Sequence, residues 1–115
     1  MKSLQAEEYV RIGNGGGFAG IETTYTAYRN GQLEQGGKVI ARLKEEDIDQ
    51  FISNIHILNL DAIDWNHPGN LYKFIEYTLH GKTHKITWDS NAPDVNNSLN
   101  LFYNHVNSII QKSIK

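Results

Sequence analysis

Residues 71–89 carry the clearest structural pattern in the chain, LYKFIEYTLHGKTHKITWD, in which apolar and polar side chains alternate on both sides of Gly81. A period of two is typical of strands with one buried face. A two-residue turn at Gly81-Lys82 predicts an antiparallel hairpin with His80 opposite Thr83 and Ile75 opposite Trp88. One face then carries Ile75, Tyr77, Leu79, Ile86 and Trp88, with His84 at its margin, and the other carries Glu76, Thr78, His80, Thr83, Lys85 and Thr87. A one-residue slip would bury the charged side chains, so this separation supports the pairing.

A helical period appears on both sides of this hairpin. The cluster Ser90–Asp94, with a proline near the first turn, predicts a helix start. After it, apolar residues recur at steps of three and four, at Val95, Leu99, Phe102, Val106 and Ile109. Before the hairpin, a similar stripe is formed by Ile48, Phe51, Ile52 and Ile55. Three acidic residues precede that stripe and favour a helix N-terminus. We therefore predict a helix from Glu45 to about Asn59, a loop at Asp61–Asn70, and a long C-terminal amphipathic helix.

The N-terminal part of the chain is rich in β-branched and aromatic residues and in glycine. It predicts strands at residues 8–12, 21–28 and 32–43. The segment Gly13–Gly17 follows the first strand and predicts a glycine-rich loop. Asn30-Gly31 predicts a hairpin with a type I′ turn, because this turn requires two positive φ angles. Gly36-Gly37 predicts a bulge or a break in the returning strand.

These elements follow the order β-β-β-α-β-β-α in a single domain that spans residues 1–115. Hairpins give antiparallel pairing, and two helices that are apolar on one side need one sheet face to cover. We therefore predict an α+β fold with an antiparallel sheet of four to five strands and two helices packed on one face. The predicted core consists of Ile48, Phe51, Ile52, Ile75, Tyr77, Leu79, Ile86, Trp88, Leu99, Phe102 and Val106.

Composition excludes several classes of function. The 115 residues carry a formal net charge of −2, and no two basic residues are adjacent, which disfavours nucleic-acid binding. The absence of cysteine excludes disulfides, thiol catalysis and iron–sulfur clusters. No apolar stretch approaches the roughly 20 residues of a membrane span. The first residues lack the apolar core of a signal peptide, which fits both a cytoplasmic protein and the mature part of an exported one.

The sequence contains no arrangement typical of a catalytic, cofactor or metal site. Gly15–Gly20 matches the phosphate-binding pattern G-x-G-x-x-G, but a strand rather than a helix follows it, so these glycines more simply allow tight turning. In the predicted hairpin, His80 and His84 point to opposite faces and do not share a metal ion. Asp61, Asp64 and His67 form the densest set of ligand types, yet they lie in one polar loop without a rigid frame. We expect no enzyme activity, no cofactor and no bound metal.

The segment Gly16-Gly17-Phe18-Ala19-Gly20 resembles the emfourin family, which are small proteinaceous inhibitors of thermolysin-type zinc metalloproteases such as protealysin. The resemblance continues in a helix with an apolar stripe, a strand with a tyrosine, a short turn, a second strand and a final amphipathic helix. The positions that carry it are Phe51 with Ile55, Tyr77 with Leu79, the turn at Gly81-Lys82, His84 with Ile86, and Leu99 with Phe102. The resemblance implies an inhibitor whose partner is a metalloprotease.

Two segments are the candidates for partner contact. They comprise the glycine-rich residues Asn14, Gly15, Gly16, Gly17 and Phe18, and the loop residues Asp64, Trp65 and His67. The glycines would allow close backbone approach, Trp65 would act as a rigid aromatic anchor, and an acidic or imidazole group would approach the zinc of the protease. The alternative at Trp65 is an indole that folds back over the edge of the core. The alternative function is a non-inhibitory binding or structural domain that uses the polar sheet face.

Overall fold

The computed structural model of this chain describes residues 8–17, 20–92 and 95–114. In this part, one sheet of seven strands has the order β4-β3-β2-β1-β6-β7-β5. All strand pairs are antiparallel except β5 with β7. The elements are β1 Tyr9–Gly16, β2 Ile21–Tyr28, β3 Gln32–Gln35, β4 Lys38–Arg42, α1 Glu45–Ile57, the 3-10 helix η1 Leu60–Ala62, β5 Asn66–His67, β6 Leu71–Leu79, β7 Lys82–Asp89 and α2 Asn97–Ser113.

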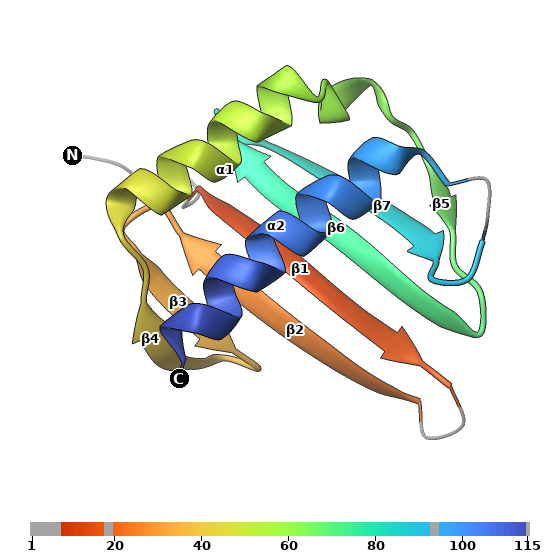
Figure 1. The fold of residues 1–115 in the computed structure, drawn as a ribbon, viewed down its shortest axis with the longest axis horizontal. Coiled ribbons are helices and arrows are strands. Elements are labelled where there is room, and N and C mark those ends of the chain that lie inside the picture. The colour runs from red at the N-terminus through yellow and green to blue at the C-terminus, as the bar shows by residue number, and fades with distance from the viewer. Residues whose placement is uncertain (1–7, 18–19, 93–94, 115) are drawn as a thin grey trace.

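Helices α1 and α2 both lie across one face of the sheet, and no helix of the described residues lies over the other face (Figure 1). The α+β class with a mostly antiparallel sheet is confirmed. The predicted core residues are buried except Ile52, which is partly buried and packs against the core. The apolar stripes of both helices thus face the sheet. Neither α1 nor α2 is long and apolar enough to cross a membrane.

The sheet has more strands than the predicted four to five, for two reasons. The returning strand breaks at Gly36-Gly37, where both residues have positive φ, and this break separates β3 from β4. A register shift between Leu33 and Glu34 then leaves Ile40 as an extra residue in β4. The predicted loop at Asp61–Asn70 overlaps the end of η1 and contains the short strand β5, which adds one more strand at the far edge.

The hairpin of β6 and β7 has the predicted faces but a different register. Thr78 pairs with Thr83 and Ile75 pairs with Ile86, so the turn consists of His80-Gly81 and not Gly81-Lys82. His80 (φ 53°) and Gly81 (φ 77°) both have positive φ, as a type I′ turn requires. The pairing differs from the prediction by two residues. Because side chains alternate with a period of two, a shift of two leaves every residue on its predicted face.

The turn between β2 and β3 differs from the type I′ turn predicted at Asn30-Gly31. Of the residues in this turn only Gly31 has positive φ. The connection has three residues, closed by a hydrogen bond of 2.9 Å from the Gly31 N–H to the Tyr28 carbonyl. The Asn30 side chain accepts a hydrogen bond from the Gln32 N–H at 2.9 Å. Asn30 therefore acts through its side chain rather than through its backbone conformation.

Candidate functional site

The glycine-rich segment is mostly strand, which corrects the predicted loop at Gly13–Gly17. β1 continues to Gly16, and of the predicted contact residues Asn14, Gly15 and Gly16 belong to it. Cross-strand aromatic rings cover the glycines: an added Cβ at Gly13 would lie 2.4 Å from the Phe74 ring, and one at Gly15 would lie 2.7 Å from the Tyr72 hydroxyl. Glycine is thus required in this strand because aromatic side chains of β6 occupy the space above it. Phe18 lies outside the described residues.

Gly16 and Gly17 fasten the end of β1 to the segment that precedes β6. Gly16 has φ of 90°, and an added Cβ would lie 2.0 Å from the Asn70 carbonyl oxygen. That same oxygen accepts a hydrogen bond of 2.7 Å from the Gly17 N–H. The sequence suggested that these glycines allow the backbone of a partner to approach closely. In the structure it is the backbone of Asn70, in the same chain, that approaches them. We call the region formed by Gly16, Gly17, Ile21, Asn70 and Leu71 the glycine end of the sheet.

Asn14 is exposed, but its side chain already has a structural contact. Its amide donates a hydrogen bond of 3.0 Å to the Tyr103 hydroxyl of α2, which ties β1 to that helix. Burial raises the pKa of Tyr103, and the hydrogen bond from Asn14 partly opposes this shift. The Lys73 ammonium lies 5.0 Å from the centre of the same ring. These contacts fix the side of the glycine end that faces α2.

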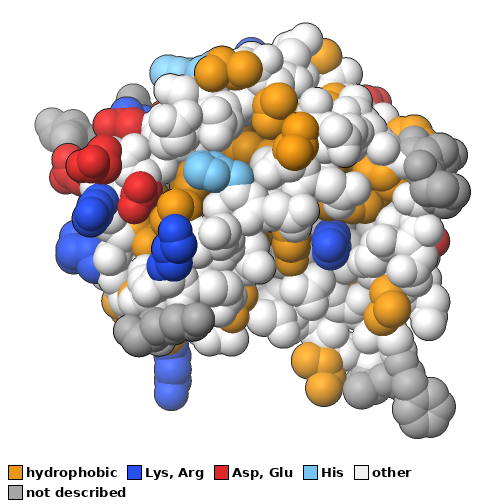
Figure 2. Space-filling view, in the orientation of Figure 1, with side chains coloured by type: hydrophobic (Ala, Val, Ile, Leu, Met, Phe, Trp, Pro, Cys, Tyr) orange, Lys and Arg blue, Asp and Glu red, His pale blue; other side chains and the backbone are white. Residues whose placement is uncertain are grey.

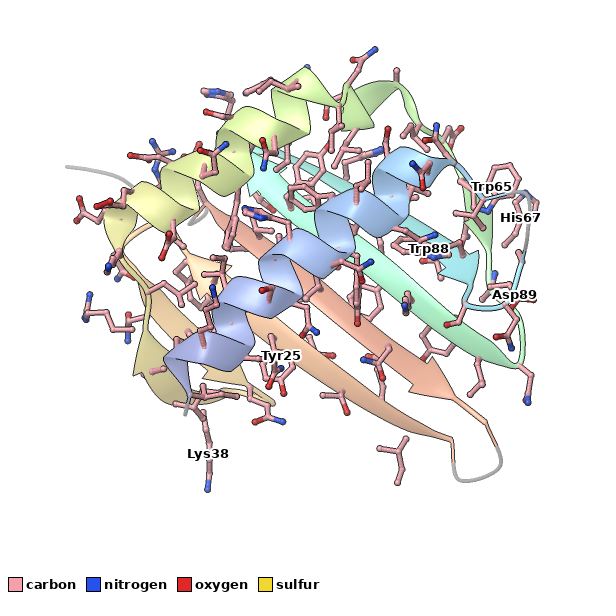
Figure 3. The ribbon with its side chains drawn as sticks, in the orientation of Figure 1. Tyr25, Lys38, Trp65, His67, Trp88 and Asp89 are labelled. Carbon is pink, nitrogen blue, oxygen red and sulfur yellow. The ribbon has the colours of Figure 1, made fainter. Side chains whose placement is uncertain are left out.

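Trp65 and His67 lie at the sheet edge formed by β5, beside β7 (Figure 3). The Trp65 carbonyl accepts a hydrogen bond of 3.1 Å from the Thr87 N–H, and its indole is partly buried against the core. The exposed His67 ring meets the Trp65 ring edge-on, with 4.7 Å between their centres. Trp65 therefore packs mainly against the edge of the core, and His67 has the more accessible ring of the two. Asp64 is exposed and lines a shallow depression with Asn66, Lys85 and Thr87.

The two predicted contact segments lie at the same end of the sheet but do not touch. β6 and β7 separate β1 from β5. The chain from β5 to β6 spans this gap, because His67 pairs with Trp88 while Asn70 already contacts Gly17. Gly69 is held there closely, since an added Cβ would lie 2.3 Å from the Asp89 carboxylate. The ends of β1, β6, β7 and β5 and the connection between β5 and β6 therefore form one continuous surface.

Sequence patterns missed two exposed apolar residues at the glycine end. Gly16 pairs with Ile21 on one side and with Leu71 on the other, so these two side chains flank a residue that has none. Ile21 is 68% exposed and Leu71 is 43% exposed. Ile21 and Leu71 are brought near each other by the pairing of β1 with β2 and β6. This pairing could not be predicted from the positions of apolar residues in the sequence.

A cavity of about 460 Å³ lies at the opposite end of the sheet, near the turn between β6 and β7. It is lined by His56, Asp61, Tyr77, Leu79, His80, Lys82, Thr83 and His84. The Tyr77 hydroxyl donates a hydrogen bond to the Asp61 carboxylate, and the His84 ring bonds the Ile63 carbonyl at 2.9 Å. His80, in the turn, and His84, on β7, both border this cavity. Within the described residues no three His, Asp or Glu side chains are placed to hold a metal ion.

The change Tyr77→Phe tests the contact with Asp61 through the pH dependence of stability. Burial and then the hydrogen bond to Asp61 raise the pKa of Tyr77 above its usual 10.0. The unfolded chain then releases this proton first as the pH rises, so the stabilisation is complete below pH 10 and is lost above it. Above about pH 10 we expect the unfolding free energy of the wild type to fall by about 1.4 kcal/mol more per pH unit than that of Tyr77→Phe. Urea unfolding at about pH 8 and about pH 11 measures this, and equal pH slopes would contradict it.

No protein-family model matches this chain, and no curated protein matches it either. The glycine end combines a fixed backbone with the exposed apolar side chains of Ile21 and Leu71, and the second predicted contact segment lies at the same end of the sheet without touching it.

Proposed function

We propose that this chain is a small binding protein that inhibits a thermolysin-type metalloprotease by one-to-one binding at the glycine end. The observation that supports this most is the exposed pair Ile21 and Leu71 on either side of Gly16. Large apolar side chains on an accessible surface are typical of protein contact sites. The Asn70 carbonyl fills the side-chain position of Gly16, so the pair is mounted on fixed backbone.

Preorganisation is the physical reason why such a surface gives tight binding. The glycine end is fixed by the hydrogen bond between Gly17 and Asn70 and by the bond between Asn14 and Tyr103. A surface that is already ordered loses little conformational entropy when it docks, so a modest buried area suffices. In this proposal the protein acts as a stoichiometric blocker and needs no cofactor or catalytic residue of its own.

The resemblance of Gly16–Gly20 to the emfourin family supplies the class of partner. In the proposed complex the glycine end enters the protease cleft, and one exposed group at the same end of the sheet, Asp64 or His67, approaches the catalytic zinc. Carboxylate and imidazole are both ordinary zinc ligands. The Trp65 ring contacts the His67 ring and helps to hold it in place. Because Trp65 also packs against the core, it contributes less direct contact with the protease than the sequence suggested.

Titration of a thermolysin-type protease with the purified chain tests this proposal. We expect activity to fall steadily and to approach zero near one equivalent. Ile21→Ala should weaken inhibition about tenfold, because it removes an exposed apolar contact without disturbing the core.

The matched control is Ile57→Ala, which makes the same change at a 73% exposed isoleucine at the end of α1. This variant should inhibit like the wild type. Full protease activity at large molar excess, with several such enzymes, would refute the proposal. Equal effects of the two isoleucine changes would show that the contact lies elsewhere than the glycine end.

The second candidate is a non-inhibitory binding domain that uses the sheet face without helices. On this face Arg11 contacts three neighbours: its guanidinium lies 4.6 Å from the Tyr9 ring centre, 3.1 Å from the Glu76 carboxylate and 2.9 Å from the Thr26 hydroxyl. An ordered face of aromatic and charged groups favours this candidate. It predicts a protein that leaves proteases fully active and whose partner binding is lost in Arg11→Ala.

A further inference from the structure

Strand β4 forms one edge of the sheet and pairs only with β3 within the described residues. Its outer side therefore presents backbone N–H and C=O groups to solvent. Both of its central apolar residues are also accessible, with Val39 55% and Ile40 38% exposed. An open edge of this kind is the template on which a further strand adds by backbone hydrogen bonds.

Four basic side chains surround this edge. Lys38 and Arg42 begin and end β4, Lys44 follows it, and Lys112 reaches the same region from α2. None of them forms an ion pair with any residue that the structure describes. Lys38 extends away from the body of the protein (Figure 3). We call β4 together with these four cations the basic edge.

A groove of about 400 Å³ continues the basic edge beyond the end of β4. Arg42, Lys44 and Lys112 line it, and Asp47 is the acidic side chain in its lining. Basic side chains gather over this side of the molecule, next to the acidic start of α1 (Figure 2). The cations exceed the acidic groups at the groove although the whole chain has a net charge of −2. The local surplus is therefore complementary to a negatively charged partner.

We propose that the basic edge binds an extended acidic peptide segment of a partner protein as an additional strand beside β4. The segment's backbone bonds the outer groups of β4, its carboxylates lie beside Lys38 on one face, and its apolar residues lie beside Val39 on the other face. Carboxylates beyond the strand also reach Arg42 in the groove. Further carboxylates beyond the strand reach the groove at Lys44. This site is separate from the glycine end, and the proposal does not rest on protease inhibition.

Charge and backbone geometry favour this occupant over two others. A second copy of the chain would bring its own Lys38 and Arg42 against the same cations, and like charges at a strand edge oppose such pairing. A nucleic acid offers phosphate acceptors to the cations but no alternating donors and acceptors to the strand edge.

A binding experiment with the full chain uses a capped peptide of about eight residues in which glutamate alternates with valine. Two comparison peptides carry lysine in place of glutamate, or N-methyl groups on alternate backbone amides. We expect saturable binding of the acidic peptide by fluorescence anisotropy, with amide shifts in NMR spectra concentrated at Lys38–Arg42. The lysine peptide and the N-methylated peptide should each bind at least about tenfold more weakly.

Two charge reversals in the protein provide a matched pair. Lys38→Glu changes the basic edge, whereas Lys82→Glu changes another exposed lysine, on β7 and away from β4. Binding of the acidic peptide should weaken about tenfold in Lys38→Glu and stay within about twofold of the wild type in Lys82→Glu. Both lysines are exposed, and neither forms an ion pair with a described residue. Neither change should therefore affect folding.

Several results would overturn the proposal. Equal affinity for the N-methylated peptide would mean that charge acts without strand addition. Tighter binding of a single-stranded oligonucleotide, or a dimer that Lys38→Glu abolishes, would assign the basic edge to another occupant. Lack of acidic-peptide binding at millimolar concentration would refute the site itself.

Discussion

Replacing Phe102 with alanine is expected to lower the free energy of unfolding by about 3–5 kcal/mol. The Phe102 side chain is 1% exposed and lies on the α2 face that packs against the sheet. Its removal leaves a cavity that the strands beneath cannot fill, since a hydrogen-bonded sheet moves little. The loss is a large share of the about 5–15 kcal/mol that stabilises a typical domain. Urea unfolding followed by circular dichroism measures it.

The neighbouring residue on α2 provides the control. Leu101 is 55% exposed on the solvent side of the helix, so Leu101→Ala should change the unfolding free energy by no more than about 0.5 kcal/mol. Similar losses for the two variants would mean that α2 does not present its predicted face to the sheet. The expected contrast therefore tests the orientation of the helix as well as the packing of one ring.

Helix orientation could be predicted from sequence because it depends on a local repeat. The spacing of Phe51 and Ile55, or of Leu99 and Phe102, specifies one helix face without knowledge of any partner. Both pairs are buried as expected. The first residue of α2 was predicted less accurately than the face of the helix. Its N-cap is Asn96, which accepts the Ser98 N–H at 2.8 Å, rather than a residue of the predicted Ser90–Asp94 cluster.

Turn geometry could not be predicted equally well, because it depends on how the flanking strands pair. The type I′ turn was expected at Asn30-Gly31 and occurs at His80-Gly81. Asn-Gly is the strongest short signal for a type I′ turn, and His-Gly is a weaker one, so residue preference alone points to the wrong turn. The cross-strand contacts of β6 and β7, including the hydrogen bond between Thr78 and Thr83, accompany the register that holds His80 in this conformation.

In the candidate site, too, local features could be predicted from the sequence, whereas contacts between distant segments could not. Composition pointed to the glycine segment, but the reason for its glycines lies in Phe74, Tyr72 and Asn70, which are more than 50 positions away in the chain. The exposed pair Ile21 and Leu71 likewise depends on the pairing of β1 with two neighbours. Such contacts between distant segments leave no periodic signal in a single sequence.

Replacing Gly16 with alanine is expected to cost at least about 3 kcal/mol, because two effects add at one residue. An L side chain at φ of 90° is strained by about 1–2 kcal/mol. Its Cβ would also lie 2.0 Å from the Asn70 carbonyl oxygen, and this backbone group is held by the Gly17 N–H and cannot rotate away. Either Asn70 or the end of β1 must move. Urea unfolding of the variant measures the cost.

Gly20→Ala separates strain from collision, since Gly20 has φ of 65° but no atom within 4 Å of an added Cβ. It should cost only about 1 kcal/mol and should inhibit a thermolysin-type protease like the wild type. In Gly16→Ala, displacement of Asn70 also displaces Leu71 relative to Ile21, so inhibition should weaken even under conditions where the variant is fully folded. Equal stability losses for both glycines would show that Asn70 yields easily. A folded Gly16→Ala that inhibits normally would separate the rigidity of the glycine end from the proposed function.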